Sequence, residues 1–241
     1  MIGLGTIINV AAVLLGGILG KLFRKLFADE KQDALQKACG ISTLFIAIAG
    51  AMEGMLKIEN NSITSAKAML VVLCVVFGTL IGEAIRIERG FEKLGEFLKA
   101  KTGNAKDVKF VDAFVTTSLT VCIGAMAIVG SIQDGISGDF TTLAVKSVLD
   151  FIIVAVMTVS LGKGAVFSAI PILLLEGSVT LLARFIAPVL TDTAISYLSL
   201  VGSVLIFCVG VNLVWGKKIR VANMLPAVLL AIGLAYVPLN F

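Results

Sequence analysis

The sequence contains no histidine, and only 15% of its 241 residues are charged. Without histidine, Ser-His-Asp and Cys-His catalytic arrangements are excluded, as are histidine-ligated metals and an imidazole pH switch. The four cysteines lie far apart in apolar runs with no C-x-x-C spacing: Cys39, Cys74, Cys122 and Cys208. We therefore expect buried thiols, with neither a disulfide nor a zinc site. The composition predicts no metal centre and no cofactor.

Charge is scarce because apolar residues replace it. Soluble domains have about a quarter charged residues and roughly 45–50% apolar residues. Here 58% of the chain is hydrophobic and the mean hydropathy is +1.04. One soluble core of this size cannot enclose that surplus, so the sequence predicts an integral membrane protein.

Apolar runs that could cross a bilayer recur along the whole chain. A spanning helix needs about 20 mostly apolar residues. We predict an all-α polytopic bundle of about eight spans, forming a single membrane domain over residues 1–241. The first run has no basic leader and no small-residue cleavage site, so we expect a permanent span and not a signal peptide. The predicted spans lie near residues 2–20, 39–57, 67–85, 110–132, 143–162, 164–186, 194–215 and 221–239.

Lysine and arginine are distributed unevenly among the predicted loops. The loops after odd-numbered spans hold sixteen of the twenty basic residues. By the positive-inside rule these loops face the cytoplasm, and both termini lie outside. This topology accounts for the net charge of +4, so the expected partner is the lipid bilayer and not a nucleic acid.

The longest polar stretch, residues 86–109, is predicted to be a cytoplasmic loop with an amphipathic pattern. Apolar residues recur there at helical spacing among charged ones: Ile87, Phe91, Leu94 and Leu98. This pattern is typical of a short helix on the membrane surface. We expect surface anchoring, with partner binding as the alternative.

Two stretches of the N-terminal half are similar to each other. Residues 16–24 and 78–86 both read Gly-x-aliphatic-aliphatic-Gly-charge-x-x-Arg, and Gly-Ala-Met follows at 50–52 and 124–126. These matches predict a duplicated hairpin. Chance similarity between apolar stretches is the alternative.

The same stretches contain two G-x-x-x-G pairs. Gly16 with Gly20, and Gly78 with Gly82, each leave a flat groove where another helix can approach closely. We expect helix packing within one subunit, with a dimer interface as the alternative.

Glu176 lies near the middle of the predicted sixth span, five residues after Pro171. A charge in hydrocarbon costs at least about 2.5–3.5 kcal/mol on insertion scales. Pro171 is expected to free a carbonyl near a broken helix. Glu176 could carry a proton or bind a cation, or it could stay protonated or pair with a polar neighbour such as Asn212. Asn212 itself could link helices or lie at the mouth of an anion path.

A second set of polar residues lies where the fourth span ends and the fifth begins. Gln133 and Asp134 are followed by Lys146 and Asp150, four residues apart on one helix face. Lys146 and Asp150 could neutralise each other, or the carboxylates could form a vestibule that binds a cation. Thr117, in a hydroxyl-rich run, could line a water path or bond to its own helix.

Five segments occur together in an order that is specific to one family. They are residues 5–9 with 16–17, 78–89, 131–135, 167–171 and 218–223. In these segments the chain resembles the bacterial YqgA-like membrane proteins. The resemblance covers nearly the whole chain and implies a bacterial inner-membrane protein of several helices, often described as a candidate transport protein, with no known substrate. The position of Glu176 is often uncharged in that family, which moves the expected functional carboxylates toward Asp134 and Asp150.

Polar residues concentrate in spans four to six while the other spans stay apolar. The sequence therefore predicts a transport protein or channel for an ion or small polar solute. The alternative is a non-transporting scaffold or sensor that acts through its basic cytoplasmic loops. An enzyme is not expected, because no nucleophile is spaced beside a base. Eight short spans make a thin bundle, so we also expect a homodimer.

Overall fold

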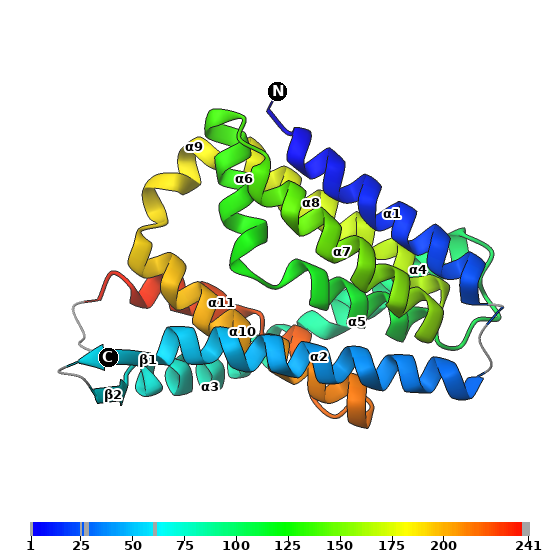
Figure 1. Cartoon of the computed structure of the whole chain (residues 1–241), viewed down its shortest axis with the longest axis horizontal. Helices are drawn as coiled ribbons and strands as arrows, with labels where there is room; N and C mark the ends of the chain where they lie inside the picture. Colours follow the sequence, from blue (N-terminus) through cyan, green and yellow to red (C-terminus); the bar gives the residue numbers. More distant parts are fainter. Residues whose placement is uncertain (1, 25, 27–28, 60–61, 238–241) are drawn as a thin grey trace.

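The chain folds into a bundle of helices, shown in Figure 1 as a computed structural model. The structure describes residues 2–24, 26, 29–59 and 62–237. In chain order the elements are α1 (Leu4–Arg24), α2 (Asp29–Met55), β1 (Leu56–Glu59), β2 (Ser62–Ser65), α3 (Ala68–Ile85), α4 (Ile87–Lys101), α5 (Phe110–Cys122), α6 (Ala125–Ser137), α7 (Thr141–Ser160), η1 (Lys163–Ser168), α8 (Ala169–Leu181), α9 (Ala183–Ile186), η2 (Ala187–Val189), α10 (Asp192–Trp215), η3 (Val221–Met224) and α11 (Pro226–Leu234).

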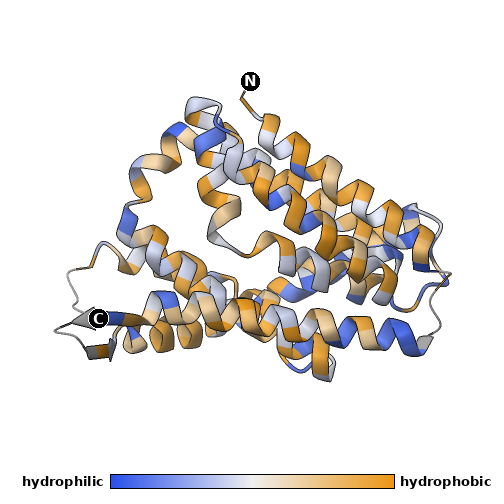
Figure 2. Cartoon of the chain, viewed as in Figure 1, coloured by the Kyte–Doolittle hydropathy of each residue, from blue (hydrophilic) through white to orange (hydrophobic). Residues whose placement is uncertain are grey.

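Among the described residues, six helices are long and apolar enough to cross a membrane. They are Leu4–Arg24, Glu30–Met55, Ala68–Ile85, Thr141–Ser160, Lys163–Leu181 and Asp192–Trp215. The bent pair α5 and α6 makes a seventh if it counts as one span, and the eighth predicted span corresponds to the shorter apolar helix Val221–Leu234. Figure 2 shows hydrophobic residues along most of this bundle and a hydrophilic start of α2. The prediction of an all-α polytopic bundle is confirmed.

A short β-hairpin joins α2 to α3, which the sequence analysis did not predict. β1 and β2 pair antiparallel, with Lys57 opposite Thr64. α2 is also longer than predicted, because it begins at Asp29 and not near residue 39. Its polar first turns continue the apolar helix beyond the length that hydropathy indicates.

The two glycine pairs pack helices within the subunit, as expected. A Cβ added at Gly16 would overlap the Phe151 carbonyl oxygen of α7. A Cβ added at Gly82 would overlap the Asn223 carbonyl oxygen of η3. Gly20 and Gly78 make the same kind of close approach to α7 and α11. These glycines bring backbones together at distances that no larger residue allows.

The two halves of the predicted duplication agree only in part. α1 and α3 use their glycine pairs in the same way. However, Gly50 lies inside the continuous helix α2, whereas Gly124 lies between α5 and α6. The first helices of the two hairpins are therefore alike and the second helices are not, so the duplication stays a prediction.

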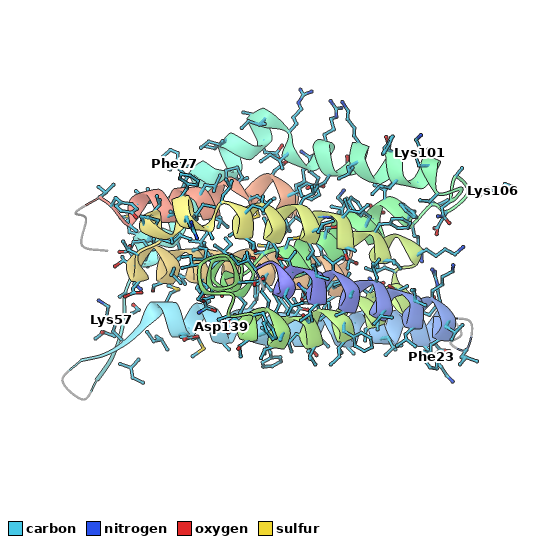
Figure 3. The ribbon with its side chains drawn as sticks, turned by 90° about the horizontal axis from the view of Figure 1, so that it is seen from above. Phe23, Lys57, Phe77, Lys101, Lys106 and Asp139 are labelled. Carbon is cyan, nitrogen blue, oxygen red and sulfur yellow. The ribbon has the colours of Figure 1, made fainter. Side chains whose placement is uncertain are left out.

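The four basic loops lie at the same end of the molecule. A cavity of about 260 Å³ is lined there by Gln36, Lys109 and Lys217, among others, which lie in the first, third and seventh predicted loops. A Cβ at Gly162, next to the fifth loop, would contact Arg24 of the first loop. Figure 3 shows Phe23, Lys101 and Lys106 at this end and Lys57 at the opposite end. We call it the basic end; its grouping agrees with the loop alternation inferred from the sequence.

The amphipathic segment forms helix α4, which packs against the protein. Ile87, Phe91 and Leu94 pack on the core cluster, and Leu98 is buried in it. The expected anchoring surface is therefore largely covered, because α5 and η3 supply an apolar partner for the face that lipid was expected to cover. Phe97, which is 56% exposed, remains on the outside.

Candidate functional site

The helix that leads into the site is interrupted. α5 ends at Cys122, α6 begins at Ala125, and the axes of Phe110–Cys122 and Met126–Ser137 are bent by 61°. Gly124 lies in the break with φ 152° and ψ 149°, a conformation that residues with a Cβ rarely adopt. The predicted fourth span is therefore two half-helices, and the last turn of α5 has carbonyl groups without helical partners.

A second irregular segment precedes α8. Residues Lys163–Ser168 form the 3₁₀ helix η1, and α8 begins at Ala169. Pro171 therefore lies in the first turn of α8, where its missing N–H would have had no helical partner. This corrects the expectation that Pro171 frees a carbonyl inside the helix: the irregular backbone lies before the proline.

Four polar side chains from α1, α7 and α8 meet beside the first break, and we call Asn9, Lys146, Asp150 and Glu176 the charged cluster. Lys146 forms an ion pair with Asp150, and its Nζ lies 3.7 Å from Glu176 Oε1. Asn9 Nδ2 donates to Asp150 Oδ2 at 3.0 Å and to Glu176 Oε1 at 2.8 Å. Lys146 Nζ also donates to the Val121 carbonyl, in the last turn of α5, at 2.8 Å.

The charged cluster is enclosed by the bundle. The exposed fractions are 0% for Asn9, 6% for Lys146, 4% for Asp150 and 1% for Glu176. Two carboxyl groups face one ammonium, so ionisation of both would leave a buried excess of negative charge, which is costly. Asn9 Oδ1 and Glu176 Oε2 have no hydrogen-bond partner among the described residues. The cluster can therefore accept a further donor or a positive charge.

A cavity of about 330 Å³ reaches the cluster from one side. It lies between α2, α6, α7 and α10, and both Lys146 and Asp150 line it. Its other polar or flexible lining residues include Thr43, Thr120, Gly124, Ser199 and Ser203. The ion pair is therefore buried and also adjacent to open space.

Polar contacts continue from the cluster toward the N-terminal end of α1. The Thr6 and Thr180 hydroxyls lie 3.3 Å apart. Beyond them, the Asp134 carboxylate accepts from Gly3 N at 3.1 Å and from Gly5 N at 2.9 Å. Asp134 thus binds the free N–H groups at the start of α1, about one helical turn from Asn9. Its predicted role in binding a cation stays a prediction.

Buried hydroxyls lie on the other side of the cluster, toward the basic end. Thr158 is eight residues beyond Asp150 on α7, and Ser168 is eight residues before Glu176, so each is about 12 Å away along its helix. Thr117 is one turn before Val121 on α5. These three hydroxyls and Ser118 Oγ have no partner among the described residues. Thr117 therefore does not bond to its own helix, which was one of the two expectations.

We call these buried polar side chains, on both sides of the charged cluster, the polar row. Besides the charged cluster, its members are Asp134, Thr6 and Thr180 toward the N-terminal end of α1, and Ser168, Thr117, Ser118 and Thr158 toward the basic end. Each has an exposed fraction of 6% or less.

Two predicted site residues lie outside the polar row. Gln133 Oε1 accepts from the Thr142 hydroxyl at 2.6 Å and so joins α6 to α7. Asn212 Nδ2 donates to the Ile219 carbonyl at 2.7 Å, and its Oδ1 accepts from Lys218 N and Ile219 N. Asn212 thus holds the loop after α10, and Glu176 pairs with Asn9 and Lys146 in its place.

Asn9 was not among the site residues predicted from the sequence. The signal that could have found it is its amide within the apolar run of α1. No local pattern indicates that this amide faces residues 141 and 167 positions further along the chain.

The comparisons with known proteins agree with this architecture. The chain is 28% identical over 227 residues to the uncharacterized membrane protein YdfK of Bacillus subtilis, covering 94% of this chain and 93% of that protein. It is 29% identical over 236 residues to the uncharacterized protein YqgA of Escherichia coli, covering 96% of each. No solved structure matches the chain. The family model described as protein of unknown function (DUF554) matches residues 4–236, and the chain, which is a multi-pass membrane protein, belongs to this family.

Proposed function

We propose that the protein moves an ion or a small polar solute across the membrane along the polar row. The observation that supports this most is the charged cluster, which lies in the bundle with two unpartnered acceptor atoms and beside a cavity. A buried charge inside a membrane bundle is costly and is usually functional. Two half-helices next to such a cluster are also a common arrangement in transporters.

In this mechanism, Lys146 competes with a transported cation for the carboxylate oxygens of the charged cluster. Its ammonium lies between Asp150 and Glu176, where a transported cation would find its ligands. A cation or proton that enters must compete with this ammonium for the same oxygens. Binding of the cation or proton therefore weakens the contacts of Lys146 with Asp150 and Glu176, and its release restores them. For an anionic or polar solute, Lys146 and Asn9 would be the donors.

The test is substrate-dependent flux in liposomes that contain the purified protein. Indicator dyes follow protons, sodium, potassium and chloride, and labelled amino acids are assayed in parallel. The variants Asp150→Asn and Glu176→Gln are compared with Glu53→Gln, which neutralises an exposed carboxylate on α2. We expect about a tenfold loss of flux in the first two and none in the third, because each cluster variant removes a charge-assisted contact. Absence of flux from the unmodified protein for every solute would contradict the proposal.

The scaffold alternative is less well supported. It needs the apolar face of α4 to be available, and Ile87, Phe91 and Leu94 pack partly on the core, although they also line an apolar cavity of about 540 Å³. Replacing exposed basic residues of α4, such as Lys93, would abolish a scaffold function and leave transport intact.

We further propose a bacterial inner-membrane location, with the basic end in the cytoplasm and both termini outside, following the positive-inside rule. Labelling of single introduced cysteines from either side tests this orientation. We also propose a homodimer, and its mass in nanodiscs tests that. The proposed function is transport and not catalysis.

A further inference from the structure

A polar pocket of about 740 Å³ lies at the basic end, outside the polar row. It is formed where α3 meets α4 and where the loop after α10 approaches η3. The residues that line it are Glu83, Arg86, Glu88, Arg89, Glu92, Lys217, Lys218, Ile219, Arg220 and Asn223. Five of these are cationic and three are anionic, so the pocket has an excess of positive charge.

The carboxylates in the pocket already have cationic partners. Lys217 Nζ lies 2.8 Å from Glu88 Oε1 and 2.9 Å from Glu92 Oε1. Arg220 Nη1 lies 3.2 Å from Glu83 Oε2. Burial lowers the pKa of Lys217, but its hydrogen bonds and charge interactions with Glu88 and Glu92 outweigh this and raise it above its usual value. Lys217 therefore stays charged and paired with these glutamates.

Three cations in the pocket have no carboxylate partner among the described residues. They are Arg86, Arg89 and Lys218, and all three side chains are exposed. Arg86 has left-handed backbone angles, φ 61° and ψ 50°, which end α3 and start α4 within one residue. This abrupt junction places Arg86 and Arg89 together at the N-terminal turn of α4.

We propose that this pocket binds a phosphate group. Arginine presents a planar set of donors that matches phosphate oxygens, and lysine adds a point charge. The volume exceeds that of phosphate alone, so the group would be part of a larger molecule. Trp215, which is 61% exposed, lies two residues before Lys217 in the sequence, and tryptophan is enriched at membrane interfaces. A phospholipid headgroup and a soluble phosphate compound share the chemistry that the pocket recognises.

The experiment measures binding to the purified full chain in detergent with two probes. Phosphatidylglycerol binding is followed by native mass spectrometry, with phosphatidylcholine as reference, and pyrophosphate binding by calorimetry. We expect saturable binding of at least one anionic probe. Binding of phosphatidylglycerol alone would identify a lipid as the source of the phosphate group, and binding of pyrophosphate alone would identify a soluble compound. Binding of both probes would also support the phosphate site.

Matched variants locate the binding. Arg89→Gln with Lys218→Gln removes two unpaired pocket cations and is expected to weaken binding by about tenfold. Lys93→Gln with Lys106→Gln removes the same charge from exposed positions that do not line the pocket, and should change affinity by less than about twofold. Glu83→Gln frees Arg220 and is expected to tighten binding, a gain that misfolding cannot mimic. Saturable binding of neither probe, or equal losses in the two double variants, would overturn the proposal.

Discussion

The side-chain amide of Asn9 on α1 donates to Glu176 on α8 across 2.8 Å, although 167 positions separate them. The same amide donates to Asp150 at 3.0 Å. One neutral residue therefore bridges two carboxylates that would otherwise repel each other in a bundle interior. Hydrogen bonds to charged groups are stronger in such a low-dielectric site than in water. This bridge joins α1 to α7 and α8 at the charged cluster.

Replacing Asn9 with alanine should destabilise the fold. Asn9→Ala leaves Glu176 Oε1 without a hydrogen-bond donor among the described residues and leaves Asp150 Oδ2 with Lys146 alone, which costs about 1–3 kcal/mol of unfolding free energy. Thermal unfolding in detergent measures the effect. Asn104→Ala is the control, since Asn104 bonds only locally to Thr102 on the surface. Equal melting temperatures for the two variants would show that the bridge contributes nothing.

Lys146→Met should be more harmful alone than in combination. By itself it leaves two buried carboxylates without a counter-ion, at a cost of about 3–5 kcal/mol. Adding Asp150→Asn removes one of these charges, so the double variant should lose less stability than the two single variants summed. The measurement is a double-mutant cycle from unfolding free energies.

A matched cycle on an exposed pair provides the control. Asp33 and Lys37 have the same i,i+4 spacing on α2, with an N···O distance of 2.7 Å, but their side chains are 59% and 54% exposed. Water screens this pair, so we expect a coupling of about 0.3–0.5 kcal/mol. A coupling as small as this at Lys146 and Asp150 would contradict the importance of burial.

A methyl group at Gly82 should disrupt the contact between α3 and η3. The added Cβ would overlap the Asn223 carbonyl oxygen, and such overpacking typically costs about 1–3 kcal/mol. Gly90→Ala on α4 is the matched control, because no atom of the described residues lies within 4 Å of its added Cβ. Alanine is the better helix former there, so Gly90→Ala should be neutral or stabilising by up to about 1 kcal/mol. Thermal unfolding of both variants decides whether close backbone approach is required.

Gly124→Ala should be costly although it meets no neighbour. No neighbour in the described ranges lies within 4 Å of its added Cβ, but φ is 152°, and such strain costs about 1–3 kcal/mol. Gly177→Ala, within helix α8 and equally free of neighbours, should be neutral or stabilising. If both variants unfold at the same temperature, the backbone at the break does not need glycine. The flux measured with the Gly124→Ala variant further tests whether the half-helix geometry is required for transport.

Local patterns predicted most of the architecture and part of the site. Long apolar runs identified the spans because length and hydropathy are local properties. The i,i+4 spacing of Lys146 and Asp150 indicated their ion pair for the same reason. The break at Gly124 was not predicted, since a glycine within a predicted span does not by itself interrupt a helix. The helix start before Pro171 was missed because 3₁₀ and α-helical segments have similar composition.

By itself, the sequence determined that this chain is a multi-pass helical membrane protein with most of its basic residues in alternate loops, because burial in lipid and charge near its surface depend on composition and order alone. The tertiary structure decided which polar residues meet. It brought Asn9 to Glu176, assigned Asp134 to the start of α1, and left Arg86, Arg89 and Lys218 without carboxylate partners in the part of the chain that it describes. These pairings depend on how the glycine contacts and the helix breaks position one helix relative to another. No single segment of the sequence determines that geometry.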